Sequence, residues 1–279
     1  MILETNRLIL REMQQSDYPA LCAMLQDDEV MYAYEGAFSD EEAQAWLDMQ
    51  LRRYAEDGFG LWAVILKEGG QEGVKMGDQL IGQCGITWQS LADRQVMEVG
   101  YIFNKDYWHQ GYATEAARAC RDYAFEKLAA DEVFSIIRDT NMASIGVARR
   151  NGMSVSDSSV KHYRGVDMPH IHFSIDRQSW SMYRKINRFL DSQGRLTAYP
   201  AKYKLRVFSQ FYLASKFDPG LVYSEGEINS VLQAWHSFDD WAMLRRDLYD
   251  SRFLGREPDC SQYWLEANQP TLAGFRLEV

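Results

Sequence analysis

A polar turn between a predicted strand and a predicted helix is the stretch of this sequence best suited to chemistry. The strand ends at Phe103, and an alanine-rich helix pattern begins directly after Gly111. A helix start leaves backbone N–H groups without intrahelical acceptors and carries partial positive charge, so it binds anions well. Glycine also lets a ligand approach the backbone closely. The turn therefore indicates either a phosphate-binding site or a tight connection, which is the more common role of a lone glycine.

Other chemistry finds little support in the sequence. The turn has neither the Gly-Lys-Ser/Thr of a P-loop nor the G-x-G-x-x-G pattern, which argues against nucleotide hydrolysis and NAD binding. The cysteines form no Cys-x-x-Cys pair, so neither a zinc site nor a disulfide framework is indicated. His170 and His172 are expected to be structural. No metal site is predicted.

Length and charge bound the possible functions. A chain of 279 residues suits two domains. Residues 1–178 hold 17 basic and 28 acidic side chains, a net charge of −11, whereas residues 179–279 hold 13 and 12, a net charge of +1. An acidic first part does not favour nucleic acid. No apolar run reaches the roughly 20 residues of a membrane helix, and no signal peptide is recognisable, so a cytoplasmic protein without membrane contact is expected.

The elements that position the turn follow from apolar periodicity and capping residues. Residues 7–12, 61–67, 79–88, 96–103, 132–139 and 170–176 read as strands, some of them separated by glycine-rich turns. Helices are expected near residue 21, from Ser39 with the S-x-x-E capping pattern, after Gly111, and from Asn141 to Gly152. This order predicts an α/β (α+β) fold in which a mixed, mostly antiparallel sheet is flanked by helices.

The pattern changes after residue 178. Helices are predicted at 199–217, at 223–235 with a Ser224/Glu227 capping box, and at 239–254, followed by a short hairpin at 255–266. Three helices and a hairpin indicate a small, winged-helix-like domain. We therefore expect a first domain at 1–178 and a second at 179–279.

Several motifs in the first domain resemble the GCN5-related N-acetyltransferase (GNAT) superfamily, within it the ribosomal-protein-alanine acetyltransferase (RimJ/RimL)-like branch. They are "NRLILRE", "LIGQCGI", "EVGYIF", "YWHQGYATEAA" and "NMASIGVARRNGM", which occur in family order and at family spacing. Trp108 departs from the superfamily pattern, which has Gln or Arg there, although this branch often has an aromatic residue. The second domain resembles the DUF2087 family in "GRLTAYPAKYKLR", "YSEGEINSVL" and "LRRDLYDSRFLGR".

The resemblance implies an acyltransferase with acetyl-CoA as cosubstrate and no metal. Main-chain groups of Tyr101, Ile102 and Phe103 would then pair with the pantetheine arm. Asn141 and Ser144 would lie beside the arm and the sulfur. The backbone N–H groups of the turn would hold the pyrophosphate, and they belong to His109, Gln110, Gly111, Tyr112, Ala113 and Thr114.

Acetyl transfer to an amine needs a base for the amine and an acid for the leaving thiolate. Ser144 is the candidate acid; the alternative is an ordinary serine in a first helical turn. Glu98, on the strand that would face the acceptor, is the candidate base; the alternative is a carboxylate that fixes neighbouring backbone. Glu35 would shape the acceptor pocket or be simply exposed. Trp46, Phe59 and Trp62 are expected mainly in the core, with one of them possible at the acceptor site.

The sequence thus predicts an N-acetyltransferase that moves an acetyl group from acetyl-CoA to a primary amine by direct attack. The acceptor is a protein N-terminus or a small molecule, and the protein is a monomer or a homodimer. The alternative is an acyl-CoA-binding regulatory protein whose second domain binds DNA or a protein partner. The arginines of the helix around Leu244–Leu248 could face DNA, but the charge of +1 argues against a strong phosphate-binding surface, and a solvated helix face explains them equally.

Overall fold

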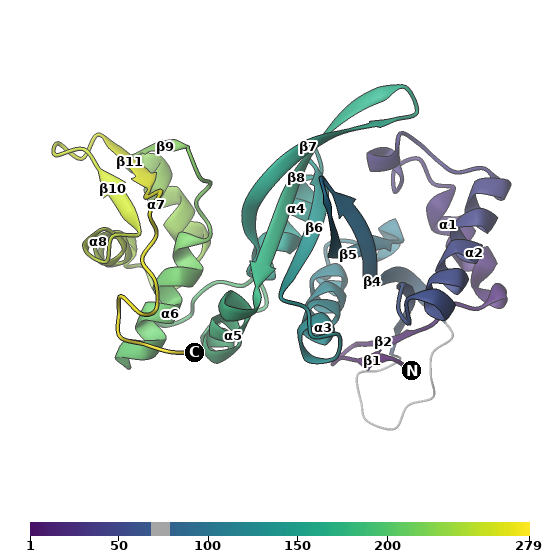
Figure 1. The fold of residues 1–279 in the computed structure, drawn as a ribbon, viewed down its shortest axis with the longest axis horizontal. Helices are drawn as coiled ribbons and strands as arrows, with labels where there is room; N and C mark the ends of the chain where they lie inside the picture. Colours follow the sequence, from purple (N-terminus) through teal and green to yellow (C-terminus); the bar gives the residue numbers. More distant parts are fainter. Residues whose placement is uncertain (68–78) are drawn as a thin grey trace. The chain divides into compact units, whose positions relative to one another are not determined.

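A computed structural model describes residues 1–67 and 79–279 of the chain. The glycine-rich turn expected between the strands at 61–67 and 79–88 lies outside these residues. In the described part, eight strands form one sheet in the order β1-β2-β3-β4-β5-β6-β8-β7 (Figure 1). The strands are β1 (Leu3–Glu4), β2 (Leu8–Arg11), β3 (Leu61–Leu66), β4 (Leu80–Leu91), β5 (Arg94–Phe103), β6 (Glu132–Arg138), β7 (Ser154–Tyr163) and β8 (Val166–Asp176).

Neighbours from β1 to β5 pair antiparallel, whereas β5 and β6 pair parallel. The helices around this sheet are α1 (Tyr18–Leu25), α2 (Asp40–Glu56), α3 (Tyr112–Glu126) and α4 (Met142–Arg150). Short 3₁₀ turns are η1 (Gln15–Asp17), η2 (Tyr32–Tyr34) and η3 (Lys105–Tyr107). The predicted mixed, mostly antiparallel sheet with flanking helices is confirmed.

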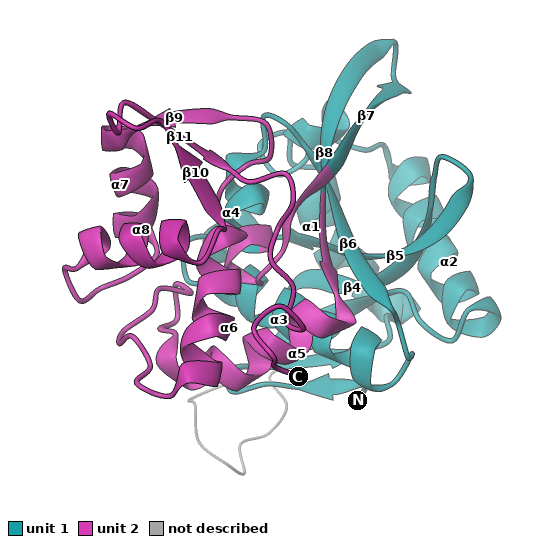
Figure 2. Cartoon of the chain, turned by 60° about the vertical axis from the view of Figure 1, so that its left-hand side comes forward, with its two compact units in different colours: residues 1–147, 157–172 teal, residues 148–156, 173–279 magenta. Residues whose placement is uncertain are grey.

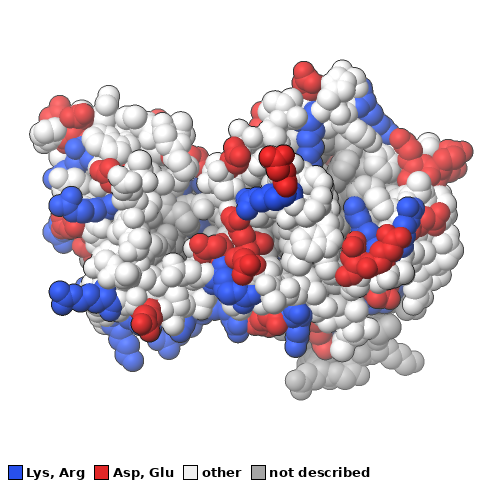
Figure 3. Space-filling view, in the orientation of Figure 1, with Lys and Arg blue, Asp and Glu red and all other residues white. Residues whose placement is uncertain are grey.

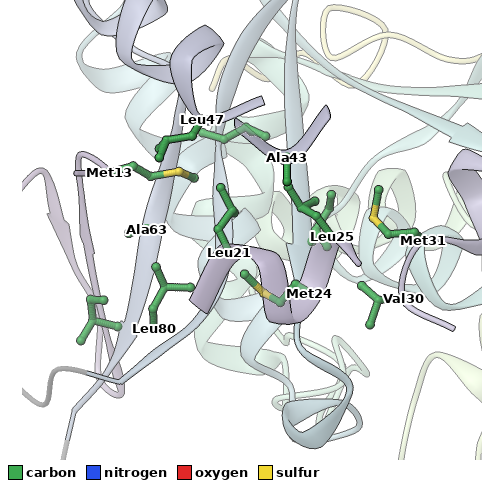
Figure 4. Close-up of a cluster of buried hydrophobic side chains, with 13 residues drawn as sticks. Met13, Leu21, Met24, Leu25, Val30, Met31, Ala43, Leu47, Ala63 and Leu80 are labelled. Atoms are coloured by element: carbon green, nitrogen blue, oxygen red, sulfur yellow. The ribbon is translucent and has the colours of Figure 1, made fainter. Parts of the chain in front are cut away.

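The sheet buries both of its faces, as β3 illustrates. Leu61, Ala63 and Ile65 join a core cluster with α1 and α2, part of which Figure 4 shows. Trp62, on the other face, contacts the ring of Tyr123 in α3 at a centroid distance of 5.4 Å. Successive strand residues point to opposite faces, so a strand covered on both sides is apolar throughout.

Local signals explain where the helices begin. At the start of α2, the Ser39 side chain accepts from the Glu42 N–H and the Glu42 carboxylate accepts from the Ser39 N–H, which confirms the predicted capping box. Helix α3 buries alanines and Cys120 against the sheet, and its small side chains permit close packing. Cys120 Sγ lies 3.5 Å from Cys84 Sγ of β4, and both cysteines are free and buried.

The C-terminal part has the winged-helix-like order of elements that the sequence predicts. After α5 (Arg177–Ile186) and η4 (Asn187–Phe189) come α6 (Tyr203–Ala214), β9 (Val222–Ser224), α7 (Glu225–Ala234), α8 (Trp241–Asp250), β10 (Leu254–Arg256) and β11 (Gln262–Leu265). The three strands form an antiparallel sheet in the order β10-β11-β9. Strand β9 was not predicted, because three residues are too few for a periodic signal.

The chain divides into two compact units, coloured in Figure 2. One consists of Met1–Val147 and Asp157–His172, the other of Ala148–Ser156 and Phe173–Val279. Helix α4 and strands β7 and β8 therefore contribute residues to both. The domain boundary at residue 178 stays a prediction.

Strand β7 is the main element that the sequence did not predict. Its residues are mostly polar, so the alternation typical of a half-buried strand is weak. The turn to β8 contains Arg164 and Gly165 with φ of 50° and 79°, a conformation that favours glycine and suits a tight hairpin. The Arg164-Gly165 pair was the one local signal in the sequence that could have indicated this hairpin.

Acidic and basic side chains alternate over the face of the first unit that Figure 3 shows, without a continuous basic field. Among residues 1–67 and 79–279, no helix combines the length and the apolar character needed to cross a bilayer.

Candidate active site

The ladder between β5 and β6 is short, and this opens the site. In the described residues its parallel register covers Met97 with Val133 and Glu98 with Phe134. Beyond Glu98, β5 continues to Phe103 and stays paired with β4 on its other side. The edge of β5 from Val99 onward therefore faces β6 without a continuous ladder. Such an edge can accept an extended ligand as an additional strand.

A cleft of about 820 Å³ lies at this opening. Its lining brings together five of the residues predicted from the sequence: Glu98, Tyr101, Ile102, Asn141 and Ser144. They come from β5 and from the start of α4, 39 to 46 positions further along the chain. The cleft is large enough for a small-molecule ligand.

Glu98 is half-buried in the wall of the cleft. Its Oε1 accepts a hydrogen bond from the Ile136 N–H at 3.1 Å, while no described residue hydrogen-bonds Oε2. Burial raises the pKa of Glu98, although the charges of Lys161 and Arg53 and the Ile136 hydrogen bond oppose this shift. The carboxylate thus fixes backbone, which is one of the two roles that the sequence indicates, and its Oε2 has no hydrogen-bond partner among the described residues.

Ser144 lies in the first turn of α4, which Asn141 caps. Asn141 Oδ1 accepts from the Ser144 N–H at 3.0 Å, and the Tyr101 hydroxyl donates to the Ser144 carbonyl oxygen at 3.3 Å. These two bonds hold the Ser144 backbone. The Ser144 hydroxyl itself makes no hydrogen bond within the described part of the chain, so it remains available to a ligand in the cleft.

The turn before α3, which the sequence predicts to hold a pyrophosphate, lies outside the lining of this cleft. His109, Gln110 and Gly111 are exposed, and His109 and Gly111 have φ of 60° and 80°. Gly111 is the N-terminal cap of α3, and the Glu115 N–H donates to its carbonyl oxygen at 3.0 Å. The N–H groups of Tyr112 and Ala113, at the start of α3, belong to the first helical turn, where N–H groups lack intrahelical acceptors.

Arg7, which the sequence analysis did not single out, lies against this turn. Its Nη1 donates to the Gln110 carbonyl oxygen at 2.9 Å, and its guanidinium lies 4.4 Å from the centre of the Tyr112 ring. Its charge is paired with Glu115 in the first turn of α3, so Arg7 positions this turn rather than adding an unpaired positive charge to it. Arg7 is distant in sequence from the turn, so no local pattern could have revealed it.

The described lining of the cleft does not include every predicted residue. Phe103 is buried, and its carbonyl oxygen accepts from the Trp108 indole at 2.9 Å. The turn residues His109, Gln110, Gly111, Tyr112, Ala113 and Thr114 also lie outside that lining.

Aromatic side chains form another wall of the cleft. Tyr34, Phe38 and Trp46 meet edge to face, with ring centroids 5.8 to 6.1 Å apart. The Trp46 indole N–H donates to Gln83 Oε1 at 2.9 Å, so its polar atom is satisfied. Of the three aromatic residues considered for the acceptor site, Trp46 lines the cleft, while Phe59 and Trp62 are buried in the core. A role at the acceptor site stays a prediction.

His170, expected to be structural, also lines the cleft. Its Nδ1 lies 2.8 Å from the Met168 carbonyl oxygen, and burial lowers its pKa. Because a carbonyl only accepts, Nδ1 carries the proton of the neutral ring and Nε2 is left unprotonated.

Glu35 does not line the cleft. It forms an ion pair with Arg138, and Arg138 does line the cleft. No group of three His, Cys, Asp or Glu side chains suited to a metal ion occurs among the described residues.

Two family models match the chain. Residues 7–154 match the acetyltransferase (GNAT) domain, and residues 195–265 match DUF2087, an uncharacterized protein family conserved in bacteria. The chain is 36% identical over 155 residues to the uncharacterized protein YkkB of Bacillus subtilis, covering 55% of this chain and 86% of that protein. It is 29% identical over 193 residues to FsC-acetyl coenzyme A-N(2)-transacetylase of Aspergillus fumigatus, covering 66% and 79%.

Solved structures share the fold of the first part of the chain. A GNAT-family acetyltransferase from Bacillus anthracis has a TM-score of 0.51 at 23% identity, over 63% of this chain and 98% of that one. RimL, a ribosomal L7/L12 α-N-protein acetyltransferase solved with coenzyme A, has a TM-score of 0.50 at 15% identity, over 63% and 97%. With a family model matching more than half of its residues, the chain belongs to the GNAT acetyltransferases and is an acyltransferase that carries a C-terminal DUF2087 domain.

Proposed function

We propose that this protein is a cytoplasmic N-acetyltransferase that moves the acetyl group of acetyl-CoA to a primary amine by direct attack. The observation that carries the proposal is the early end of the β5–β6 ladder at Glu98, next to a cleft that also contains the start of α4. Membership of the GNAT family supports acetyl-CoA as the cosubstrate.

Residues of two places would hold acetyl-CoA, which supplies the acetyl group as an activated thioester. Main-chain groups of Tyr101, Ile102 and Phe103 on the open edge of β5 would pair with the pantetheine arm, with Asn141 beside it. The backbone N–H groups from His109 to Thr114 would hold the pyrophosphate at the start of α3. Both places offer backbone donors to a ligand, which fits an extended cosubstrate that ends in a diphosphate.

Glu98 is the proposed base. It would take a proton from the acceptor ammonium, directly or through water, so that the amine nitrogen attacks the thioester carbonyl carbon. The C–N bond forms and the C–S bond breaks. The raised pKa brings Glu98 closer to the pH at which the enzyme works, which favours proton exchange.

Ser144 is the proposed acid. Its hydroxyl would give a proton to the leaving sulfur and recover the second proton that the attacking nitrogen must lose as the amide forms. Support comes from its place in the lining of the cleft and from the two hydrogen bonds that hold its backbone while its hydroxyl stays available. A positioned acid of this kind typically contributes about 100- to 10,000-fold to the rate.

Calorimetry with the full chain and a thiol-release assay test the proposal together. We expect saturable acetyl-CoA binding and thiol release that requires an added primary amine. Absence of acetyl-CoA binding at millimolar concentration would overturn the proposal. Binding without turnover by any amine class would instead favour the alternative of an acyl-CoA-binding regulatory protein.

A further inference from the structure

The charged side chains of the cleft do not cancel. Five of its described lining residues are acidic or permanently basic: Glu42, Arg53, Glu98, Arg138 and Lys161. Two of these already have ion-pair partners that do not line the cleft: Glu42 pairs with Arg164, and Arg138 pairs with Glu35. Arg53 and Lys161 therefore remain against a single carboxylate, that of Glu98.

The two remaining cations have donors to spare. The Lys161 ammonium makes no hydrogen bond or ion pair with any residue of 1–67 and 79–279, and the side chain is exposed. Arg53 donates from Nη1 to Gln50 Oε1 at 3.3 Å and forms no ion pair among the described residues. A guanidinium has five N–H donors and an ammonium has three, and both are suited to an anionic oxygen. Local positive charge without a partner is what an anionic ligand group would neutralise.

Both cations lie close to the proposed reaction centre. The charges of Lys161 and Arg53 both act on the Glu98 carboxyl, and all three residues line the same cleft. They belong to three different elements: α2 for Arg53, β5 for Glu98 and β7 for Lys161. An amine placed at Glu98 therefore shares the cleft with the side chains of Arg53 and Lys161.

The remaining wall suits an apolar body. Tyr34, Phe38 and Trp46 form one continuous aromatic surface, and the polar atom of Trp46 is already satisfied by Gln83. A polyamine would place further positive charge near Arg53 and Lys161, which costs free energy in a partly desolvated cleft. A protein N-terminus has no carboxylate beside its amine.

We infer that the acceptor is a free amino acid with an apolar or aromatic side chain, whose amine meets Glu98 while its carboxylate is bound by Arg53 and Lys161. This inference rests on the proposed function. The side chain packs on the aromatic wall. Arg53 and Lys161 determine specificity and take no part in proton transfer.

The experiment measures acetyl transfer by the full-length protein to the protein amino acids, each compared with its amide and, for phenylalanine, with phenethylamine. We expect at least one apolar or aromatic acid to be preferred over its amide by tenfold or more in kcat/KM. The amides have the more readily deprotonated amine, so this comparison is weighted against the inference. Equal use of acid and amide, or acetyl-CoA binding without acetylation of any amino acid, would overturn it.

Variants separate specificity from catalysis. Arg53→Gln and Lys161→Gln should each lower kcat/KM for the preferred acid about tenfold more than for its amide. Because both charges also act on Glu98, a change in kcat that acid and amide share is expected. Arg52→Gln, which alters the adjacent exposed residue outside the described lining, should change neither this preference nor kcat. Equal losses for acid and amide would contradict the assignment. Failure to bind acetyl-CoA at all would refute the proposed function and not the choice of acceptor alone.

Discussion

Arg7 and Glu115 form an ion pair with 2.7 Å between Nε and Oε2, which joins the segment before β2 to the first turn of α3. Glu115 also accepts from the Arg7 N–H at 2.9 Å and from the Thr5 hydroxyl at 2.6 Å. A carboxylate in a first helical turn is favourable in itself. The pair therefore fixes the helix start whose N–H groups are proposed to hold the pyrophosphate, and it keeps the Arg7 cation beside it.

Glu115→Gln should destabilise the protein in a pH-dependent way. Burial acts to raise the pKa of Glu115, but the hydrogen bonds from Thr5 and Arg7 outweigh it and lower the pKa below the ordinary 4.5. The stabilisation is therefore present above the unfolded-state value and is lost as pH falls through the folded-state pKa. We expect a loss of about 1 to 2 kcal/mol at pH 7 that shrinks below pH 4.5, measured by urea unfolding. Glu132→Gln, which alters a looser ion pair of 3.5 Å, is the control and should change stability little.

Gly111→Ala should weaken acetyl-CoA binding beyond its effect on folding. The residue has φ of +80°, where an L side chain costs about 1 to 2 kcal/mol. A Cβ there would also lie 3.5 Å from the Arg7 guanidinium. Gly220→Ala is the matched control, because Gly220 has φ of +77° with nothing within 4 Å. Both variants should lose similar stability, and only Gly111→Ala should lose acetyl-CoA affinity in calorimetry; equal affinities would exclude the turn from the site.

Glu98→Gln should lower activity without lowering stability. Burial raises the pKa of Glu98 in the folded state, so the protonated carboxyl favours folding and its ionisation opposes folding. The stability that the protonated form contributes is present below the unfolded-state pKa and is lost as pH rises through the folded-state pKa. The amide oxygen of glutamine can still accept from the Ile136 N–H. We expect an unchanged or higher melting temperature at pH 7 and a fall of roughly 100-fold in kcat. Equal activity would leave Glu98 with its backbone-fixing role alone.

Ser144→Ala should lower kcat by roughly 100-fold and leave acetyl-CoA binding nearly unchanged. The substitution removes only the hydroxyl, since both hydrogen bonds that Asn141 and Tyr101 make here involve the Ser144 backbone. Amines with more acidic conjugate acids should not restore the rate, because the lost proton goes to sulfur. Steady-state kinetics with saturating acetyl-CoA measures the effect, and a variant with full kcat would rule out this acid.

Ser224→Ala should destabilise the C-terminal unit by about 1 kcal/mol. Its hydroxyl accepts from the Glu227 N–H at the start of α7, and the Glu227 carboxylate accepts from the Ser224 N–H. Ser230→Ala is the control, because that exposed hydroxyl donates only to the Gly226 carbonyl one turn earlier. Calorimetric unfolding should show a shift for Ser224→Ala and none for Ser230→Ala.

Local signals in the sequence account for most of the fold. Ser39/Glu42 and Ser224/Glu227 marked two helix starts, and apolar runs marked β3, β4 and β5. Such signals act over a few residues, because capping and side-chain periodicity are properties of a single element. Strand β7 escaped prediction because its pairing partner, and not its own composition, stabilises it.

The sequence alone determined the family, the sheet with its flanking helices, and the order of motifs that carries Glu98, Gly111 and Ser144. Tertiary structure decided what surrounds them. It placed Arg7 against the turn at Gly111 and left Arg53 and Lys161 as the unpaired cations of the described cleft. Whether a charge is paired depends on residues far apart in sequence, as with Glu35 and Arg138, and no local pattern records such pairs. The charge left for a substrate is therefore a property of the folded chain.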